Sequence, residues 1–554
     1  MNQDFQSLKL KRVWAASTLP GSVWLTIALA AFCVVFVNPF RETAVQDDWT
    51  YALTVRHLLD TGQYRLHDWA TANMPFQAHW GALFARFAGY SFGNLRLSTL
   101  VLWAFALVAF YFLCQEHGLG NQQAGLLVLG LFCCPLALYL SFTFMTDIPY
   151  LSCMIIALCL YTRALRLRRY GLMFAASLAA SAAILTRQFG AVLIGAMVLV
   201  WAVSEHRRRM VALFATGLAL PLAALGWQLQ MALAAPNWAT RHSFYRLRGF
   251  YSDPHELLES VVWRPAVILH YIALFALPLA LLTAISLRQE QSCQSGARRW
   301  LIPAIFASYL VGILVVISLY STTEPALMPL VPGVQFNMMS HPPWLTLTFR
   351  SLLTLMTTLG GSLAAWCFLS RYRFDWSQLP PHERLLDFAT AGTALATLGF
   401  WWIADKHVLL FLPYAIIVMG HKSATQLRQY GRFLAALFFL IAFVTAGYTR
   451  YRLAQNEALW KGGEIARNYA TQQQTISSSW EWTSYNYFDE FLAQNRSNLD
   501  LFEYFDWLRE HKEEADYVVG PAPPGNTSWT VLATVRYRPF PFVERRVYVT
   551  KRLP

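Results

Sequence analysis

The feature that most constrains this chain is a series of long apolar runs separated by short polar segments. A helix needs about 20 consecutive apolar residues to cross a bilayer. Thirteen runs meet or approach that length, at about 20–40, 95–114, 123–142, 147–163, 171–186, 188–204, 211–234, 264–287, 300–320, 346–370, 385–403, 405–421 and 431–448. We therefore predict a polytopic α-helical membrane protein with about 13 spans.

The composition agrees with this fold class. The chain is 56% hydrophobic and 14% charged, whereas soluble domains are about 25% charged. The net charge of +13 comes from short basic clusters between the apolar runs, such as "KLKR" (9–12), "RALRLRR" (163–169) and "EHRRR" (205–209). Such clusters are typical of cytoplasmic loops. A basic stripe across a polar domain, as nucleic-acid binding requires, is missing from the sequence.

A cytoplasmic N-terminus places all of these clusters in the cytoplasm, and an odd number of spans then places the C-terminus outside. We expect an integral multi-pass protein of a bacterial inner membrane whose first span is not cleaved. The predicted transmembrane catalytic domain is 1–449, and 41–94 is its first outer loop. Residues 450–554 are predicted to form a soluble extracytoplasmic domain.

Two outer segments have recognisable patterns. In "HWGALFARFAGYSFG" (79–93), apolar residues recur at helical spacing, which predicts a helix lying along the membrane interface. Near the C-terminus, "EYFDWLREHKEEADYVVG" reads as a helix followed by a strand. "WTVLATVRY" and "RRVYVTKR" alternate apolar and polar residues as half-buried strands do. We therefore predict a small C-terminal α/β domain.

Charged side chains gather at the predicted outer ends of the spans rather than within them. The site candidates are Asp47, Asp48, His79, Asp147, Arg187, Lys406 and His407. Transporters and pumps tend to carry such residues at mid-span, so this distribution favours a reaction site at one membrane face. A simpler alternative stays open, because Asp47 and Asp147 could each be an N-cap of the following helix.

The order of these motifs resembles a known family. "QDDWTY", "MPFQAHW", "TDIPYL", "AAILTRQFG" and "DKHVLLFLPY" follow one another as in the polytopic C-type glycosyltransferases that use lipid-linked sugars. That group includes protein O-mannosyltransferases, lipid A aminoarabinose transferases and galacturonosyltransferases of the lipopolysaccharide core. The resemblance covers roughly residues 20–420.

The resemblance implies a role for each matching residue. Asp47 matches the first acid of the family's pair, the expected catalytic base, and Asp48 stands where the family usually has Glu. Asp147 matches the second acidic position. The resemblance thus implies that Asp47, Asp48 and Asp147 are catalytic, and either of the two adjacent aspartates could be the base. The residues implied in substrate binding are Tyr51, His79, Arg187, Lys406 and His407. Met74 stands where aminoarabinose transferases have a Lys, so their donor pocket is not implied.

The reaction that the resemblance implies is the transfer of a sugar, with inversion at its anomeric carbon, from a polyprenyl phosphate to an envelope glycan, lipid or protein on the outer face. An Asp can take the proton of the acceptor hydroxyl, and cations can stabilise the departing phosphate. A divalent metal ion stays open as an additional cation, and the sequence does not decide whether the reaction requires one. The expected partners are the lipid-linked donor, the acceptor and membrane lipids; the oligomeric state is not indicated. The alternatives are a transporter or flippase for lipid-linked sugars, and a glycan polymerase or ligase.

Overall fold

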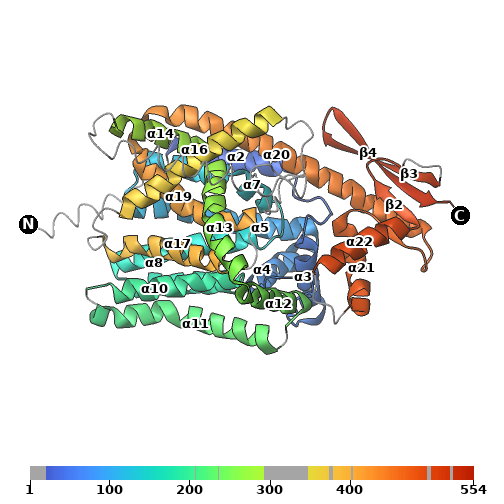
Figure 1. Ribbon diagram of the computed structural model, residues 1–554, viewed down its shortest axis with the longest axis horizontal. Helices are drawn as coiled ribbons and strands as arrows, with labels where there is room; N and C mark the ends of the chain where they lie inside the picture. Colours follow the sequence, from blue (N-terminus) through green and yellow to red (C-terminus); the bar gives the residue numbers. More distant parts are fainter. Residues whose placement is uncertain are drawn as a thin grey trace, which may run out of the picture.

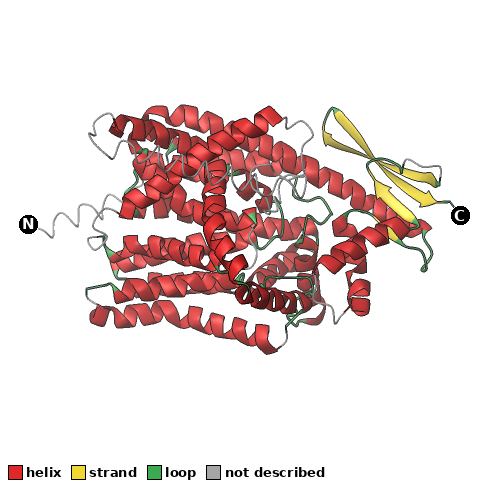
Figure 2. Ribbon diagram, viewed as in Figure 1, coloured by secondary structure: helices red, strands yellow, loops and turns green. Residues whose placement is uncertain are grey.

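The computed structural model describes residues 20–205, 207–234, 236–291, 347–372, 379–400, 404–495, 501–524 and 528–553. The described chain is mostly helical, and its four strands lie together at the C-terminal end of the helix bundle (Figures 1 and 2). The predicted span at 300–320 and the predicted outer segment 321–345 lie outside the described residues.

Several helices are long and apolar enough to cross a membrane, as the sequence predicts. Within the described ranges four helices pass this test, or up to six if each of two bent helix pairs is one span. The four are α5 (Phe92–Glu116), α8 (Asp147–Leu167), α11 (Val211–Ala234, extended to Arg207) and α20 (Ala424–Tyr469). The protein is therefore an integral membrane protein, while the predicted count of 13 stays a prediction.

The bent pairs coincide with prolines, which cannot donate a backbone hydrogen bond inside a helix. Helices α6 (Asn121–Phe132) and α7 (Pro135–Ser141) meet at 66°, and α7 begins at Pro135. The second bend, of 94°, lies between Val267–Phe275 of α13 (Pro254–Phe275) and Leu277–Ser286 of α14 (Leu277–Gln291), next to Pro278. The other apolar helices are α2 (Gly21–Val37), α9 (Tyr170–Ile184), α10 (Val192–Ala202), α16 (Leu347–Tyr372), α17 (Pro381–Leu398) and α19 (Leu412–Lys422).

The segment between α2 and α5 contains two short helices, α3 (Asp48–Thr61) and α4 (Pro75–Ala88), which pack on each other. The helix predicted at 79–93 therefore begins earlier and ends earlier than expected. It ends because Gly89 adopts a φ of +87°, a left-handed conformation that glycine tolerates better than other residues. A new helix, α5, then starts after Ser91, whose side chain accepts a hydrogen bond from Asn94 N.

The C-terminal strands form where the alternating pattern predicts them. The elements after α20 are β1 (Ile476–Ser477), α21 (Trp480–Asn495), α22 (Leu501–Glu514), β2 (Tyr517–Gly520), β3 (Trp529–Phe540) and β4 (Val543–Arg552). The sheet order is β1-β2-β4-β3, with β1 and β2 parallel and the other pairs antiparallel.

Helix α20 connects the membrane helices to this sheet. It has 46 residues and continues without a break through the predicted domain boundary at 449/450. Its C-terminal half packs against the sheet, where Ala458 and Ala466 share a buried cluster with Val547 and Val549. The division into two domains stays a prediction, and a single helix runs through it (Figure 1).

Candidate active site

Asp47 lies in the turn that leads into α3, and its side chain is half-buried. It occupies the N-cap position of α3, as the simpler interpretation predicts, but its side chain makes no capping hydrogen bond. Instead, its Oδ1 accepts a hydrogen bond of 2.9 Å from the indole Nε1 of Trp69. The carboxylate is therefore oriented away from the helix end by a residue that the sequence analysis did not single out.

Trp69 is the centre of an aromatic cluster built from distant parts of the chain. Its ring stacks on Trp238 of α12 (Trp238–Ser252) at 5.9 Å between centroids. It also contacts Phe488 of α21 at 5.5 Å and Tyr504 of α22 at 4.8 Å. Because the C-terminal helices hold the indole, they also determine where the Asp47 carboxylate points.

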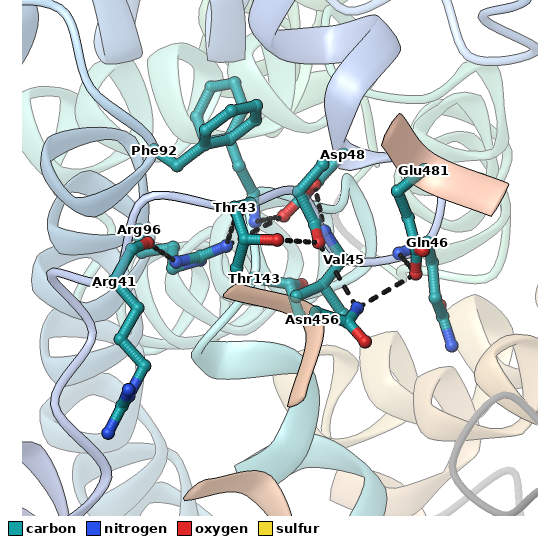
Figure 3. A network of polar contacts seen from close by, with 12 residues as sticks. Arg41, Thr43, Val45, Gln46, Asp48, Phe92, Arg96, Thr143, Asn456 and Glu481 are labelled. Atoms are coloured by element: carbon teal, nitrogen blue, oxygen red, sulfur yellow. Dashed lines mark hydrogen bonds and ion pairs between the residues drawn. The ribbon is translucent and has the colours of Figure 1, made fainter. Parts of the chain in front are cut away.

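The turn before Asp47 is held by the same region. Gln46 adopts a φ of +55°, which is unfavourable for a residue with a side chain. Its backbone N donates to Oε1 of Glu481 at 3.2 Å, and Asn456 Nδ2 donates to the same oxygen at 3.0 Å. Asn456 also donates to the carbonyl of Ala44 at 3.3 Å. Figure 3 shows Glu481 and Asn456 beside this turn, which they hold in its strained conformation.

Asp48 has a different environment from its neighbour, because it is completely buried. It accepts hydrogen bonds from Val45 N at 2.6 Å and Phe144 N at 3.4 Å, and Arg96 Nη2 lies 3.8 Å away (Figure 3). Burial raises the pKa of Asp48 to about 7, although the charge of Arg96 lowers it. Asp48 therefore joins the Asp47 turn to the loop before α8, and burial keeps it from a bound acceptor.

Arg96 is a second residue that the sequence analysis missed. It is buried in α5, and its guanidinium donates to the carbonyls of Pro39, Arg41 and Thr43. A single arginine inside the apolar run 95–114 was the available signal, since ionisable groups in spans are costly and usually paired.

Asp147 and Arg187 form a buried ion pair, in which Arg187 Nη2 lies 3.0 Å from Asp147 Oδ1. Asp147 is the first residue of α8, and the N-cap position belongs to Thr146, which corrects the expected cap. Thr146 Oγ1 accepts from Arg187 Nε at 2.8 Å. Within the described chain, neither carboxylate oxygen of Asp147 accepts a hydrogen bond of good geometry. Both oxygens are buried as well, so the pair is enclosed within the protein.

Tyr51 links this pair to Asp47. Its phenol is buried in α3, and burial raises its pKa above the usual range. The charges of Asp47 and Asp147 raise that pKa further, and the charge of Arg187 lowers it. The charges of all three groups therefore reach the phenol of Tyr51, and Asp147 and Arg187 are in direct contact with each other.

Lys406 and His407 lie on the short helix α18 (Asp405–Val408), and both are buried. The His407 ring lies 6.3 Å from that of Phe189, two residues after Arg187. Three cationic side chains, Arg187, Lys406 and Arg264, act electrostatically on its ring. Its Nδ1 accepts from Ala404 N at 3.1 Å. His407 is therefore a neutral hydrogen-bonding group, and the positive charge here comes from Lys406 and the arginines.

His79 has other neighbours. It lies on α4, where its Nδ1 is 2.7 Å from the carbonyl of Pro75 and its ring stacks with Tyr64 at 6.2 Å. The contacts of its side chain thus connect it to Tyr64 rather than to Asp47 or Asp147.

A metal site does not fit the residues described. Within the described ranges, no group of three or more His, Cys, Asp or Glu side chains is placed to hold a metal ion. Asp147 faces Arg187, and Asp47 is bonded to Trp69.

Comparisons with known proteins agree with the family expected from the motifs. Residues 73–238 match the family model of dolichyl-phosphate-mannose-protein mannosyltransferases. A search of curated proteins found no match.

Among solved structures, the chain is similar to the archaeal oligosaccharyltransferase AglB from Archaeoglobus fulgidus, with 16% identity over 90% of this chain and 69% of that chain (TM-score 0.43). It is also similar to ArnT from Cupriavidus metallidurans, with 16% identity over 96% of this chain and 98% of that chain (TM-score 0.40). The match over residues 73–238, which include Asp147 and Arg187, confirms the resemblance of this chain to glycosyltransferases that use lipid-linked sugars.

Proposed function

We propose that this protein is an inverting glycosyltransferase that moves a sugar from a polyprenyl-phosphate donor to an envelope glycan, lipid or protein. The observation that carries the proposal is the pairing of two acidic groups with opposite surroundings. Asp47 is half-buried and oriented by Trp69, whereas Asp147 is buried against Arg187. The charges of both acids also act on the buried phenol of Tyr51, which supports one shared site.

In this mechanism Asp47 is the base. Its carboxylate takes the proton of the acceptor hydroxyl while the hydroxyl oxygen attacks the anomeric carbon of the sugar. The bond between that carbon and the phosphate oxygen breaks, and the phosphate leaves with the bonding electrons. Attack from the face opposite the phosphate inverts the anomeric centre.

The cationic side of the site suits the departing phosphate. Arg187 can donate two parallel hydrogen bonds to phosphate oxygens, a geometry that guanidinium groups favour. Asp147 holds this guanidinium in place, but its negative charge offsets the positive charge of Arg187. Lys406 supplies a further positive charge nearby. His407, whose Nδ1 accepts a hydrogen bond and therefore carries no proton, contributes a hydrogen bond rather than charge.

The membrane orientation of the proposal follows from the basic clusters. We infer that the N-terminus is cytoplasmic and that the site and the residues after 450 are extracytoplasmic, on the outer side of a bacterial inner membrane.

The test is Asp47→Asn in cells that lack the native gene, with envelope glycolipids and glycoproteins analysed by mass spectrometry. We expect the unchanged chain to restore a sugar modification and Asp47→Asn to lower transfer by about 10²–10⁴-fold, the usual contribution of a general base. The lipid-linked donor should accumulate. The matched control is Asp60→Asn, which removes an exposed carboxylate from the same helix.

Full restoration by Asp47→Asn would contradict the assignment. A flippase would give a different result, because its loss leaves the donor on the inner leaflet while transfer in detergent continues normally.

A further inference from the structure

The hairpin between β3 and β4 ends in an apolar tip, residues 539–543. Phe542 in this tip is 99% exposed, and Val543 is 37% exposed. A single exposed apolar side chain is common on protein surfaces. The case for a binding partner of Phe542 therefore depends on where the tip lies and on the charge around it.

The tip is fixed to the outer end of two apolar helices. Arg450 of α20 donates through Nε to the carbonyl of Pro539 at 2.6 Å, and through Nη1 to the carbonyl of Phe36 in the last turn of α2. The Phe540 ring lies against α20 as well, 3.9 Å from the position that a Cβ on Gly447 would take. The tip therefore lies level with the C-terminal end of α2.

This level is the edge of the apolar surface of the bundle. On α20, exposed apolar side chains continue up to Phe443 (56% exposed) and Val444 (59% exposed), and the sequence becomes basic at Arg450. On α2, Val35 is 81% exposed, and Phe40 just beyond the helix is 54% exposed. Large apolar side chains exposed in this way face lipid in a membrane protein. The hairpin tip thus stands where the lipid-facing surface ends.

The hairpin next to the tip is strongly basic. Residues 536–546 contain four arginines and one glutamate, a net charge of +3. Arg536 and Arg546 are directly opposite each other in the strand register, an arrangement of like charges that destabilises a hairpin. The only carboxylate of this stretch, Glu544, lies 3.9 Å from each of these two arginines. A negatively charged surface would neutralise the excess charge.

We infer that the β3–β4 tip binds the surface of an anionic bilayer, with Phe542 inserted among the lipids and the arginines against lipid phosphates. Aromatic side chains favour the membrane–water interface. Each basic residue near an anionic surface strengthens binding about fivefold. The inference does not depend on the proposed enzymatic function. It gives the C-terminal sheet a second attachment to the membrane, in addition to α20.

The test places a nitroxide spin label at residue 542 of the full-length protein by Phe542→Cys. The protein is studied in nanodiscs of neutral phosphatidylcholine, with and without about a third of anionic phosphatidylglycerol. Power saturation then compares collisions with oxygen, which concentrates in lipid, and with a water-soluble nickel chelate. We expect the label to be more accessible to oxygen than to nickel in the anionic nanodiscs. The unsubstituted chain, labelled in the same way, gives the background from native cysteines.

Three further variants make the result specific. Val531→Cys labels an exposed position (46%) far from the tip on β3, and we expect this label to be more accessible to nickel. Pro541→Cys provides a second label in the tip if Phe542→Cys folds poorly. Adding Arg536→Gln and Arg546→Gln to Phe542→Cys should lower the oxygen-to-nickel ratio in anionic nanodiscs. If the labels at both 541 and 542 collide mainly with nickel in both bilayers, the inference is wrong. That result is expected of a tip that binds a soluble protein.

Discussion

The indole N–H of Trp69 donates a hydrogen bond of 2.9 Å to Oδ1 of Asp47. Trp69 is itself held by rings from α12, α21 and α22, and the backbone beside Asp47 is bonded to Glu481, which lies 435 residues away from Gln46. The geometry of the candidate base therefore depends on the C-terminal region, although that region lies beyond the family match at 73–238.

Trp69→Phe tests the role of this hydrogen bond. The ring of Phe keeps much of the aromatic packing but cannot donate to Asp47. We expect the rate of transfer, measured as kcat in proteoliposomes, to fall by about 10- to 100-fold, the effect of misplacing a catalytic group. KM should change little, because Trp69 orients the base.

Trp80→Phe is the matched control. Trp80 is half-buried, whereas Trp69 is buried, and it likewise donates its indole N–H, in this case to the carbonyl of Ser98 at 2.9 Å. If both variants lose the same activity, the effect of Trp69→Phe comes from general destabilisation and the positioning role is wrong.

Glu481→Ala tests the support of the strained turn at Gln46. The change removes the oxygen that accepts from both Gln46 N and Asn456 Nδ2, which costs about 1–3 kcal/mol and releases the turn. We expect transfer to fall together with the unfolding temperature. Glu481→Gln keeps an oxygen acceptor and should retain most activity. Glu490→Ala, at an exposed position of the same helix, should behave as the unchanged chain.

The Asp147–Arg187 pair makes a double-mutant prediction. Asp147→Asn alone leaves a buried guanidinium unpaired, which costs about 3–5 kcal/mol for pairs of this kind. The double variant Asp147→Asn/Arg187→Gln should recover much of the unfolding temperature. Its transfer activity should stay low, since the proposed phosphate contact is lost. Recovery of both stability and transfer would show that the pair is only structural.

His67 provides a pH dependence of stability. Its Nδ1 accepts from Trp69 N at 3.2 Å and lies 2.8 Å from Thr50 Oγ1. Burial lowers its pKa to about 4, from 6.5. Its contribution to the free energy of unfolding is therefore complete above about pH 6.5 and is lost as the pH falls toward 4, by at most about 1.4 kcal/mol per pH unit.

We expect His67→Asn, whose Oδ1 can replace Nδ1 as acceptor, to unfold at a lower temperature than the unchanged chain at pH 7. This difference should shrink as the pH falls to 4, in thermal scans at each pH. His79→Asn removes an exposed histidine and serves as the control. A difference that is constant from pH 7 to pH 4 would contradict the burial of a neutral His67.

The sequence could predict the elements because their patterns are local. The apolar run at 147–163 corresponds to α8, and the alternating "RRVYVTKR" lies within β4. Asp147 and Arg187 could be assigned to one site because both end apolar runs on the same predicted membrane face, and their ion pair agrees with that expectation.

The environments of the two adjacent aspartates could not be predicted. Asp47 and Asp48 share one local sequence, yet one is half-buried and the other is enclosed by Val45, Phe144 and Arg96. Such burial depends on contacts between residues far apart in the chain, which leave no period in the sequence. The bond from Trp69 to Asp47 was missed for the same reason.

Helix α20 has a consequence for the height at which the reaction takes place. Arg450 holds the hairpin tip at the edge of the apolar surface, and Asn456 holds the turn before Asp47. Six residues of α-helix rise about 9 Å, so these two attachment points are less than two helical turns apart along the axis. With the hairpin tip bound to the bilayer surface as inferred above, the candidate base lies close to the level of the lipid phosphates. A donor anchored by its polyprenyl chain can present its sugar there without leaving the bilayer.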